Sequence, residues 1–151
     1  MKIILALVLA ANVFAQLGEQ PPAIEKKPAP PDKVADTGAV TMPKVFFISP
    51  KDGANVKKKF KVKMGLEGMK VKAAGTLDVG TGHHHIIVDG SPIPKGSVVP
   101  KDEKNLHYGK AETTADLTLE PGEHTLTLQF ADGNHLSYGP EMSATIKVKV
   151  K

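Results

Sequence analysis

Short segments of alternating apolar and polar residues, each closed by turn residues, leave few folds open to this chain. These segments cover residues 44–49, 60–66, 83–89, 115–119, 124–130 and 142–150. A period of two places apolar side chains on one face of a β-strand and polar side chains on the other. About seven short strands without a helical period predict an all-β fold, an immunoglobulin-like antiparallel β-sandwich, with a small barrel as the alternative.

Two of the connections between these segments carry their own predictions. Pro121 and Gly122 lie between the segments 115–119 and 124–130, which is typical of a β-hairpin. The stretch through residues 106–109 follows a Gly- and Pro-rich region and is expected to be a long loop.

Residues 1–15 have the three parts of a secretory signal peptide, namely a positive start, an apolar run and small residues that end at Ala15. We therefore expect cleavage after Ala15 and a mature protein in the periplasm or secreted from the cell. The apolar run is too short for a stable anchor, and no later segment is longer, so no transmembrane anchor is expected in the mature chain.

Residues 16–42 are rich in proline, alanine, lysine and glutamate and show no apolar periodicity. Such a segment buries too little surface to offset the entropy of ordering it, so we expect a disordered, extended tether. Residues 43–151 match the common size of one domain. The chain has no cysteine, so this β-sandwich domain is expected to be held together without disulfides.

Every one of the 20 basic residues is a lysine. Recognition of base edges and bidentate recognition of phosphate rely on arginine, so a nucleic-acid partner is not expected. The lysine-rich run at residues 57–63 is expected to be a solvated strand face that discourages edge pairing.

Three consecutive histidines, His83 to His85, follow Gly82 at the start of an apolar, β-branched segment. In a strand, His83 and His85 share a face about 7 Å apart, while His84 points to the other face. Two imidazoles at that spacing can hold one metal ion, and histidine is the commonest metal ligand. In the structural alternative, His84 packs in the core and its neighbours bond to loop carbonyls.

Three further histidines follow the triplet. His107 and His135 are expected in loops, where functional side chains gather, and the loop after Phe130 can lie beside the start of the histidine strand. His124 alternates with the apolar residues that follow it and is expected to cap the core. The predicted metal ligands are His83, His85, His107 and His135, with His84, His124 and Asp132 as weaker candidates.

Imidazole ligands suit copper or zinc, which are the expected cofactors. An unperturbed histidine has a pKa near 6.5, so protons are expected to compete with the ion between about pH 7 and pH 5. The chain has no nucleophile elbow, zinc-protease helix or phosphate-binding glycine loop, so no enzyme is predicted. The alternative function is a non-metal interaction module of the cell envelope that binds a protein or glycan, with the histidines in a structural network.

Three stretches together resemble a bacterial family, the domain of unknown function 4399. They are residues 45–53, residues 65–71 and the Thr-Gly-His-His-His strand at residues 81–89, which is the most specific mark. Segments around His107, His124 and His135 match the family pattern in the same order. The resemblance covers about residues 45–150 and implies an exported β domain without a known biochemical role.

Two positions depart from the pattern of that family. Gly80 stands where an asparagine usually precedes the Thr-Gly pair, and Tyr138 stands near the place of a further histidine. The second difference removes one potential metal ligand.

Overall fold

A computed structural model describes residues 42–151, and this part of the chain contains nine strands and one short 3-10 helix. The predicted signal peptide, residues 1–15, and all but the last residue of the predicted tether, residues 16–42, lie outside the described residues. The elements are β1 (Lys44–Ser49), β2 (Ala54–Val56), β3 (Lys59–Glu67), β4 (Lys70–Val71), β5 (Thr81–Val88), β6 (Asn105–Tyr108), β7 (Thr114–Thr118), β8 (Gly122–Ala131), η1 (Pro140–Met142) and β9 (Ser143–Val150).

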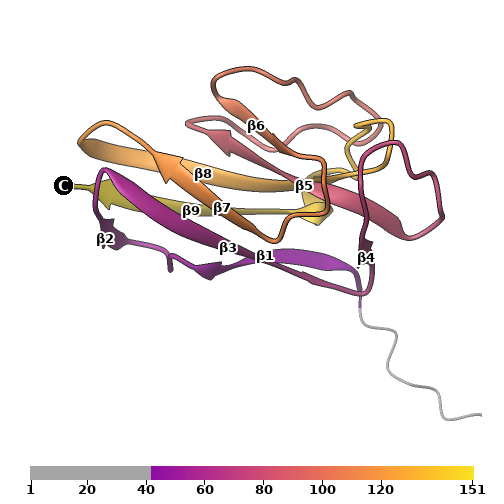
Figure 1. Ribbon diagram of the computed structural model, residues 1–151, viewed down its shortest axis with the longest axis horizontal. Coiled ribbons are helices and arrows are strands. Elements are labelled where there is room, and N and C mark those ends of the chain that lie inside the picture. Colours follow the sequence, from indigo (N-terminus) through magenta and orange to yellow (C-terminus); the bar gives the residue numbers. More distant parts are fainter. Residues whose placement is uncertain (1–41) are drawn as a thin grey trace, which may run out of the picture. The chain divides into compact units, whose positions relative to one another are not determined.

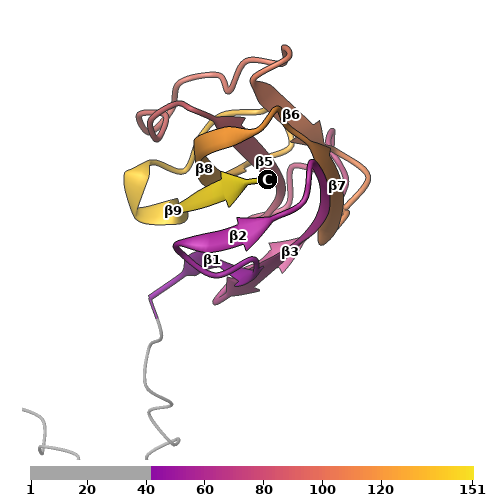
Figure 2. The same cartoon turned by 90° about the vertical axis from the view of Figure 1, so that its left-hand side faces the viewer.

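The strands form two separate sheets (Figure 1). One sheet has the order β1-β3-β7, and the other has the order β2-β9-β8-β5-β4, with β6 also paired to β5. Strand β1 belongs to the first sheet and β2 to the second, where β2 runs parallel to the last strand, β9. This two-layer arrangement, visible in Figure 2, confirms the predicted immunoglobulin-like sandwich and not the barrel.

The predicted hairpin between β7 and β8 is wrong. β7 pairs with β3 in one sheet, whereas β8 pairs with β5 and β9 in the other, so the connection at residues 119–121 crosses between the layers. The turn residues reverse the chain as expected. Leu117 and Leu126 then enter the same core from opposite sheets, so the sandwich buries both between its layers.

The core lies between the sheets and follows the alternation in the sequence. Its buried side chains include Phe47, Val62 and Leu117 from one sheet and Ile86, Leu128 and Val148 from the other. The polar faces point outward and carry exposed ion pairs, such as Lys61 with Asp116 at 3.1 Å. None of the helical structure in residues 42–151 is long and apolar enough to cross a membrane.

Strand β5 departs furthest from this one-sided burial, because all eight of its residues are buried, and the last six residues of β8 beside it are buried too. One face belongs to the core, and the loops that follow β5 and β8 cover the other face. Gln129, on that outer face, ties both loops down: its side chain accepts the N–H of Ile93 at 3.0 Å and donates to the carbonyl of Gly139 at 3.0 Å. Side chains on the outer face of β5 therefore lie in a second, smaller interior.

Candidate metal centre

His83 and His85 form the inner pair of a histidine cluster on the outer face of β5. Both rings are fully buried, and their Nε2 atoms are 3.0 Å apart. The neighbouring Gly82 is required here, because a Cβ at that position would lie 2.2 Å from the carbonyl oxygen of Ala131 in β8. The alternation of side chains along β5 places the rings of His83 and His85 on one face, as the sequence predicts.

His107 lies in strand β6, so the prediction of a loop at residues 106–109 is wrong. β6 pairs antiparallel with β5 and sets His107 directly opposite His85. The segment has only four residues and lacks a clear alternation of burial, which explains why its sequence reads as a loop. Gly109 leaves room for the imidazole, because a Cβ there would lie 2.2 Å from the Cε1 atom of His107.

His135 lies in the loop after β8, as predicted, and has a left-handed backbone with a φ of 66°. Asp132 shapes this loop: its Oδ1 accepts the N–H of Asn134 at 2.8 Å and the N–H of Leu136 at 2.9 Å. The N–H of His135 donates to the carbonyl of Asp132 at 3.0 Å. Asp132 therefore organises the loop, and its Oδ1 is occupied by backbone donors.

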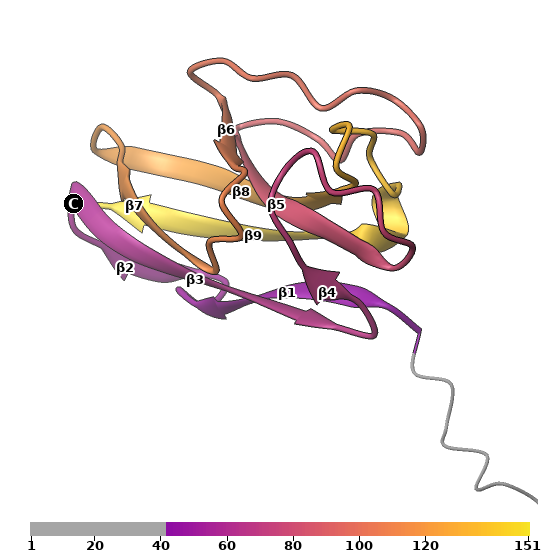
Figure 3. The same cartoon turned by 45° about the vertical axis from the view of Figure 1, so that its right-hand side comes forward.

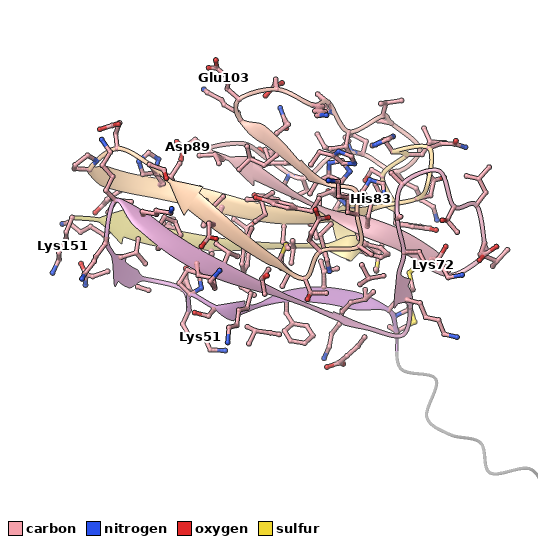
Figure 4. All side chains as sticks on the ribbon, viewed as in Figure 1. Lys51, Lys72, His83, Asp89, Glu103 and Lys151 are labelled. Atoms are coloured by element: carbon pink, nitrogen blue, oxygen red, sulfur yellow. The ribbon has the colours of Figure 1, made fainter. Side chains whose placement is uncertain are left out.

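These four imidazoles, the histidine cluster, converge from three elements that are far apart in the sequence. His107 and His135 form an outer pair, only partly buried, whose Nε2 atoms are 3.1 Å apart. The six distances between ring centroids range from 4.7 to 5.8 Å. Ligand atoms of His83, His107 and His135 all lie within 4.8 Å of one another. Figure 4 shows His83 beside a concentration of side-chain nitrogen atoms.

The buried rings are neutral at physiological pH. Desolvation, with repulsion from His107 and His135, lowers the pKa of His83 to about 4, and desolvation with repulsion from His83 lowers the pKa of His85 to about 3. Desolvation also lowers the pKa of His107. Neutral imidazoles present free lone pairs, which is the state that binds a metal ion. The carboxylates of Asp132 and Glu112 act in the opposite direction and offset part of this lowering of the His83 pKa. Their negative charge therefore also favours a cation at this position.

The spacing of the cluster is suited to a transition metal. With zinc–nitrogen bonds of about 2.0–2.1 Å, neighbouring ligand atoms around a tetrahedral ion are about 3.3 Å apart. The two Nε2 pairs, at 3.0 and 3.1 Å, are close to that separation. Four imidazole nitrogens can hold zinc or copper and supply no soft sulfur ligand.

His84, a weaker ligand candidate, points away from the cluster toward the core. It is fully buried, its ring lies 5.2 Å from the ring of Phe130, and neither ring nitrogen has a hydrogen-bond partner. Burial, with repulsion from His83, lowers its pKa to about 4. This geometry agrees with the structural alternative predicted for His84, in which its ring packs in the core.

Replacing His84 with leucine is expected to stabilise the domain and leave the cluster intact. An unpartnered buried polar group costs about 1–3 kcal/mol, and leucine removes it at a similar volume. Urea denaturation of the His84→Leu variant at pH 7 is expected to show a free energy of unfolding higher by that amount. A lower value would mean that His84 has a polar partner that stabilises the fold.

His124, the other weaker candidate among the histidines, lies near the start of β8, at the opposite end of the β5–β8 pair from the cluster. Its Nδ1 is 2.9 Å from Oδ2 of Asp89, and its Nε2 is 3.0 Å from the carbonyl oxygen of Glu120. Figure 4 shows Asp89 well separated from His83. The hydrogen bond with Asp89 raises the pKa of His124, so this residue is a capping imidazole with satisfied hydrogen bonds and does not join the cluster.

The sequence profile of the domain of unknown function DUF4399 matches residues 62–151, more than half of the chain. This chain belongs to the DUF4399 family. The matched part of the DUF4399 domain contains every residue of the histidine cluster. The matched part does not include residues 45–53, which carry one of the three stretches of the resemblance seen in the sequence.

No curated protein matches the DUF4399 chain significantly in sequence. Among solved structures, an endo-beta-1,4-mannanase from Thermotoga petrophila is 18% identical with a TM-score of 0.46, over 76% of this chain and 21% of that one. This chain thus spans about a fifth of the mannanase. The fibronectin(III)-like modules of CbhA from Clostridium thermocellum are 14% identical with a TM-score of 0.42, over 71% of this chain and 96% of that one.

Proposed function

We propose that this DUF4399 protein binds one transition-metal ion, zinc or copper, through the histidine cluster. The observation that carries the proposal is the convergence of His83, His107 and His135, whose ligand atoms lie within 4.8 Å of one another, with His85 joined to them by its Nε2 contact of 3.0 Å with His83. With the predicted signal peptide, this supports a role in metal carriage or buffering in the periplasm or outside the cell.

The protonation of the buried pair sets the cost that metal binding must offset. Each neutral imidazole has one N–H, so in a pair joined through Nε2 one ring donates and the other carries its proton on Nδ1. The Nδ1 atoms of His83 and His85 are buried and have no partner among the described residues. The contact between two neutral rings therefore leaves one Nδ1–H unpaired, whereas an ion bound by both Nε2 atoms leaves both unpaired, so the metal–nitrogen bonds must offset about 1–3 kcal/mol for each of these donors.

The arrangement favours binding over catalysis. Catalytic zinc sites keep one position open for water or substrate, whereas sites with four protein ligands are closed. Here three imidazoles form one ligand group, and His85, 3.0 Å from His83 and fully buried, is in reach of the fourth position. We infer a site that retains an ion, without a role as an enzyme.

The test is a titration of the full chain with zinc and with copper(II) at neutral pH, followed by the melting temperature with and without a chelator. We expect saturable binding of one ion and a melting temperature that the ion raises, because a ligand specific for the native state stabilises it. The matched control is His124→Ala, which removes one histidine outside the cluster and is expected to bind the ion with unchanged affinity. A melting temperature that neither metal nor chelator changes would contradict the proposal and favour the envelope interaction module.

A further inference from the structure

Residues 72–76, which follow β4, connect the three parts of the chain that carry the histidine cluster. The N–H groups of Lys72 and Ala74 donate to the carbonyls of Gly82 at 2.7 Å and Gly109 at 2.9 Å. The N–H of Gly75 donates to the carbonyl of Gly133 at 2.8 Å. Each acceptor lies one or two positions from a residue of the cluster, so one short segment contacts all three of its backbones. Figure 3 shows this connection rising from β4 and passing across β5.

Residues 72–76 pack tightly against the loop that carries His135. A Cβ on Gly133 would lie 2.1 Å from the carbonyl oxygen of Thr76 and within 2.8 Å of two further backbone atoms of that residue. Because these are backbone atoms and not the ends of flexible side chains, any larger residue at position 133 must push the two loops apart.

The segment is itself tied down at its far end. Lys72 and Asp78 form an ion pair at 2.7 Å, and the carbonyl of Asp78 accepts both the hydroxyl of Thr81 at 2.7 Å and its N–H at 3.2 Å. The ion pair is exposed and contributes little. The bonds to Thr81 fix the end of the loop at the first residue of β5, so the connection from β4 to β5 is anchored at both ends.

We propose that residues 72–76 are a strap that holds the outer pair, His107 and His135, against the inner pair and thereby sets how fast a bound ion leaves. This inference rests on the proposed metal-binding function. The inner pair is fixed by β5, which pairs on both sides, whereas His135 lies in a loop that the strap contacts at Gly133 and that the N–H of Val99 also holds, by donating to the carbonyl of His135 at 2.8 Å. Release of the ion then requires the strap to lift, which breaks the backbone bonds to Gly109 and Gly133.

The test compares Gly133→Ala with Gly53→Ala in the full chain loaded with zinc. Gly53 lies in the turn before β2 with a φ of 74° and open space around a new Cβ, so its replacement strains the fold without touching the strap. Zinc dissociation into excess chelator is expected to be about 10-fold to 100-fold faster in Gly133→Ala, the range for loss of outer contacts around metal ligands. It is expected to be unchanged in Gly53→Ala. Equal rates in a folded Gly133→Ala and the unmodified protein would overturn the strap.

Hydrogen exchange of the unmodified protein gives a second measurement that requires no variant. Zinc is expected to slow the exchange of the Ala74 and Gly75 amides, while the amide of Gly53 exchanges at the same rate with and without zinc. Identical exchange at Ala74 and Gly75 in the two states would also overturn the proposal. If the unmodified protein binds neither zinc nor copper, the proposed metal-binding function is wrong. If it binds zinc and the dissociation rate of zinc does not change with the residue at position 133, only the strap proposal is wrong.

Discussion

Zinc affinity is expected to fall by about four orders of magnitude when both His83 and His85 are replaced with alanine. Structural zinc sites with four ligands contribute about 10–16 kcal/mol, so each ligand accounts for about 3 kcal/mol if the contribution is divided evenly. Loss of two ligands then weakens binding by about 6 kcal/mol, and each 1.4 kcal/mol corresponds to a factor of ten. Isothermal titration with zinc at pH 7 measures the change.

The matched control for this double variant lies on the same strand. His84→Leu alters β5 between the two ligand positions but on the core face, and it is expected to leave zinc affinity unchanged. Both proteins must give the circular dichroism spectrum of the unmodified domain, because alanine at two buried positions leaves space that also lowers stability. Similar affinities for the double variant and the control would show that the inner pair does not bind the ion.

Lowering the pH from 7 to 5 is expected to cost the metal-free domain about 6 kcal/mol of stability, which is comparable with the lower end of the 5–15 kcal/mol of a typical domain. The buried imidazoles of His83 and His84 have a pKa of about 4, and that of His85 is about 3, mainly because burial disfavours their charged form. The unfolded chain takes up protons below about pH 6.5 while the folded chain does not. Stability is therefore full above that pH, falls as the pH drops, and loses about 2 kcal/mol for each of the three groups by pH 5.

An acid titration followed by near-ultraviolet circular dichroism measures this loss. His84→Leu removes one of the three groups and is expected to move the unfolding midpoint to lower pH. Zinc is expected to do the same, because it binds only the folded chain. A metal-free domain with constant stability between pH 7 and pH 4.5 would mean that these rings titrate alike in the folded and unfolded chain, and so are open to water.

These pKa values also move the pH range in which protons compete with the metal. From the sequence, the unperturbed value near 6.5 predicts competition between about pH 7 and pH 5. Burial lowers the pKa of the inner pair to about 4 and 3, so protons compete for His83 and His85 only below that range. Titration of the inner pair in the folded state is therefore not expected to release the ion above pH 5.

The sequence by itself determined the fold class and one half of the site. Alternation depends only on strand geometry, so it correctly put His83 and His85 on one face and His84 on the other. His107 and His135 were predicted as metal ligands because they are histidines in expected loops. Their positions in the structure depend on contacts between distant parts of the chain. His107 meets His85 because β6 pairs with β5, and no local pattern specifies that partner.

Only the tertiary structure decided the crossing from β7 to β8, the burial that lowers the histidine pKa values, and the strap. Each of these depends on contacts between residues distant in sequence, such as the bond from Gly75 to Gly133. A glycine in a sequence indicates freedom of the backbone, but it does not say which atoms approach it. The packing of Thr76 against Gly133 and of His107 against Gly109 gives those glycines their role at the site.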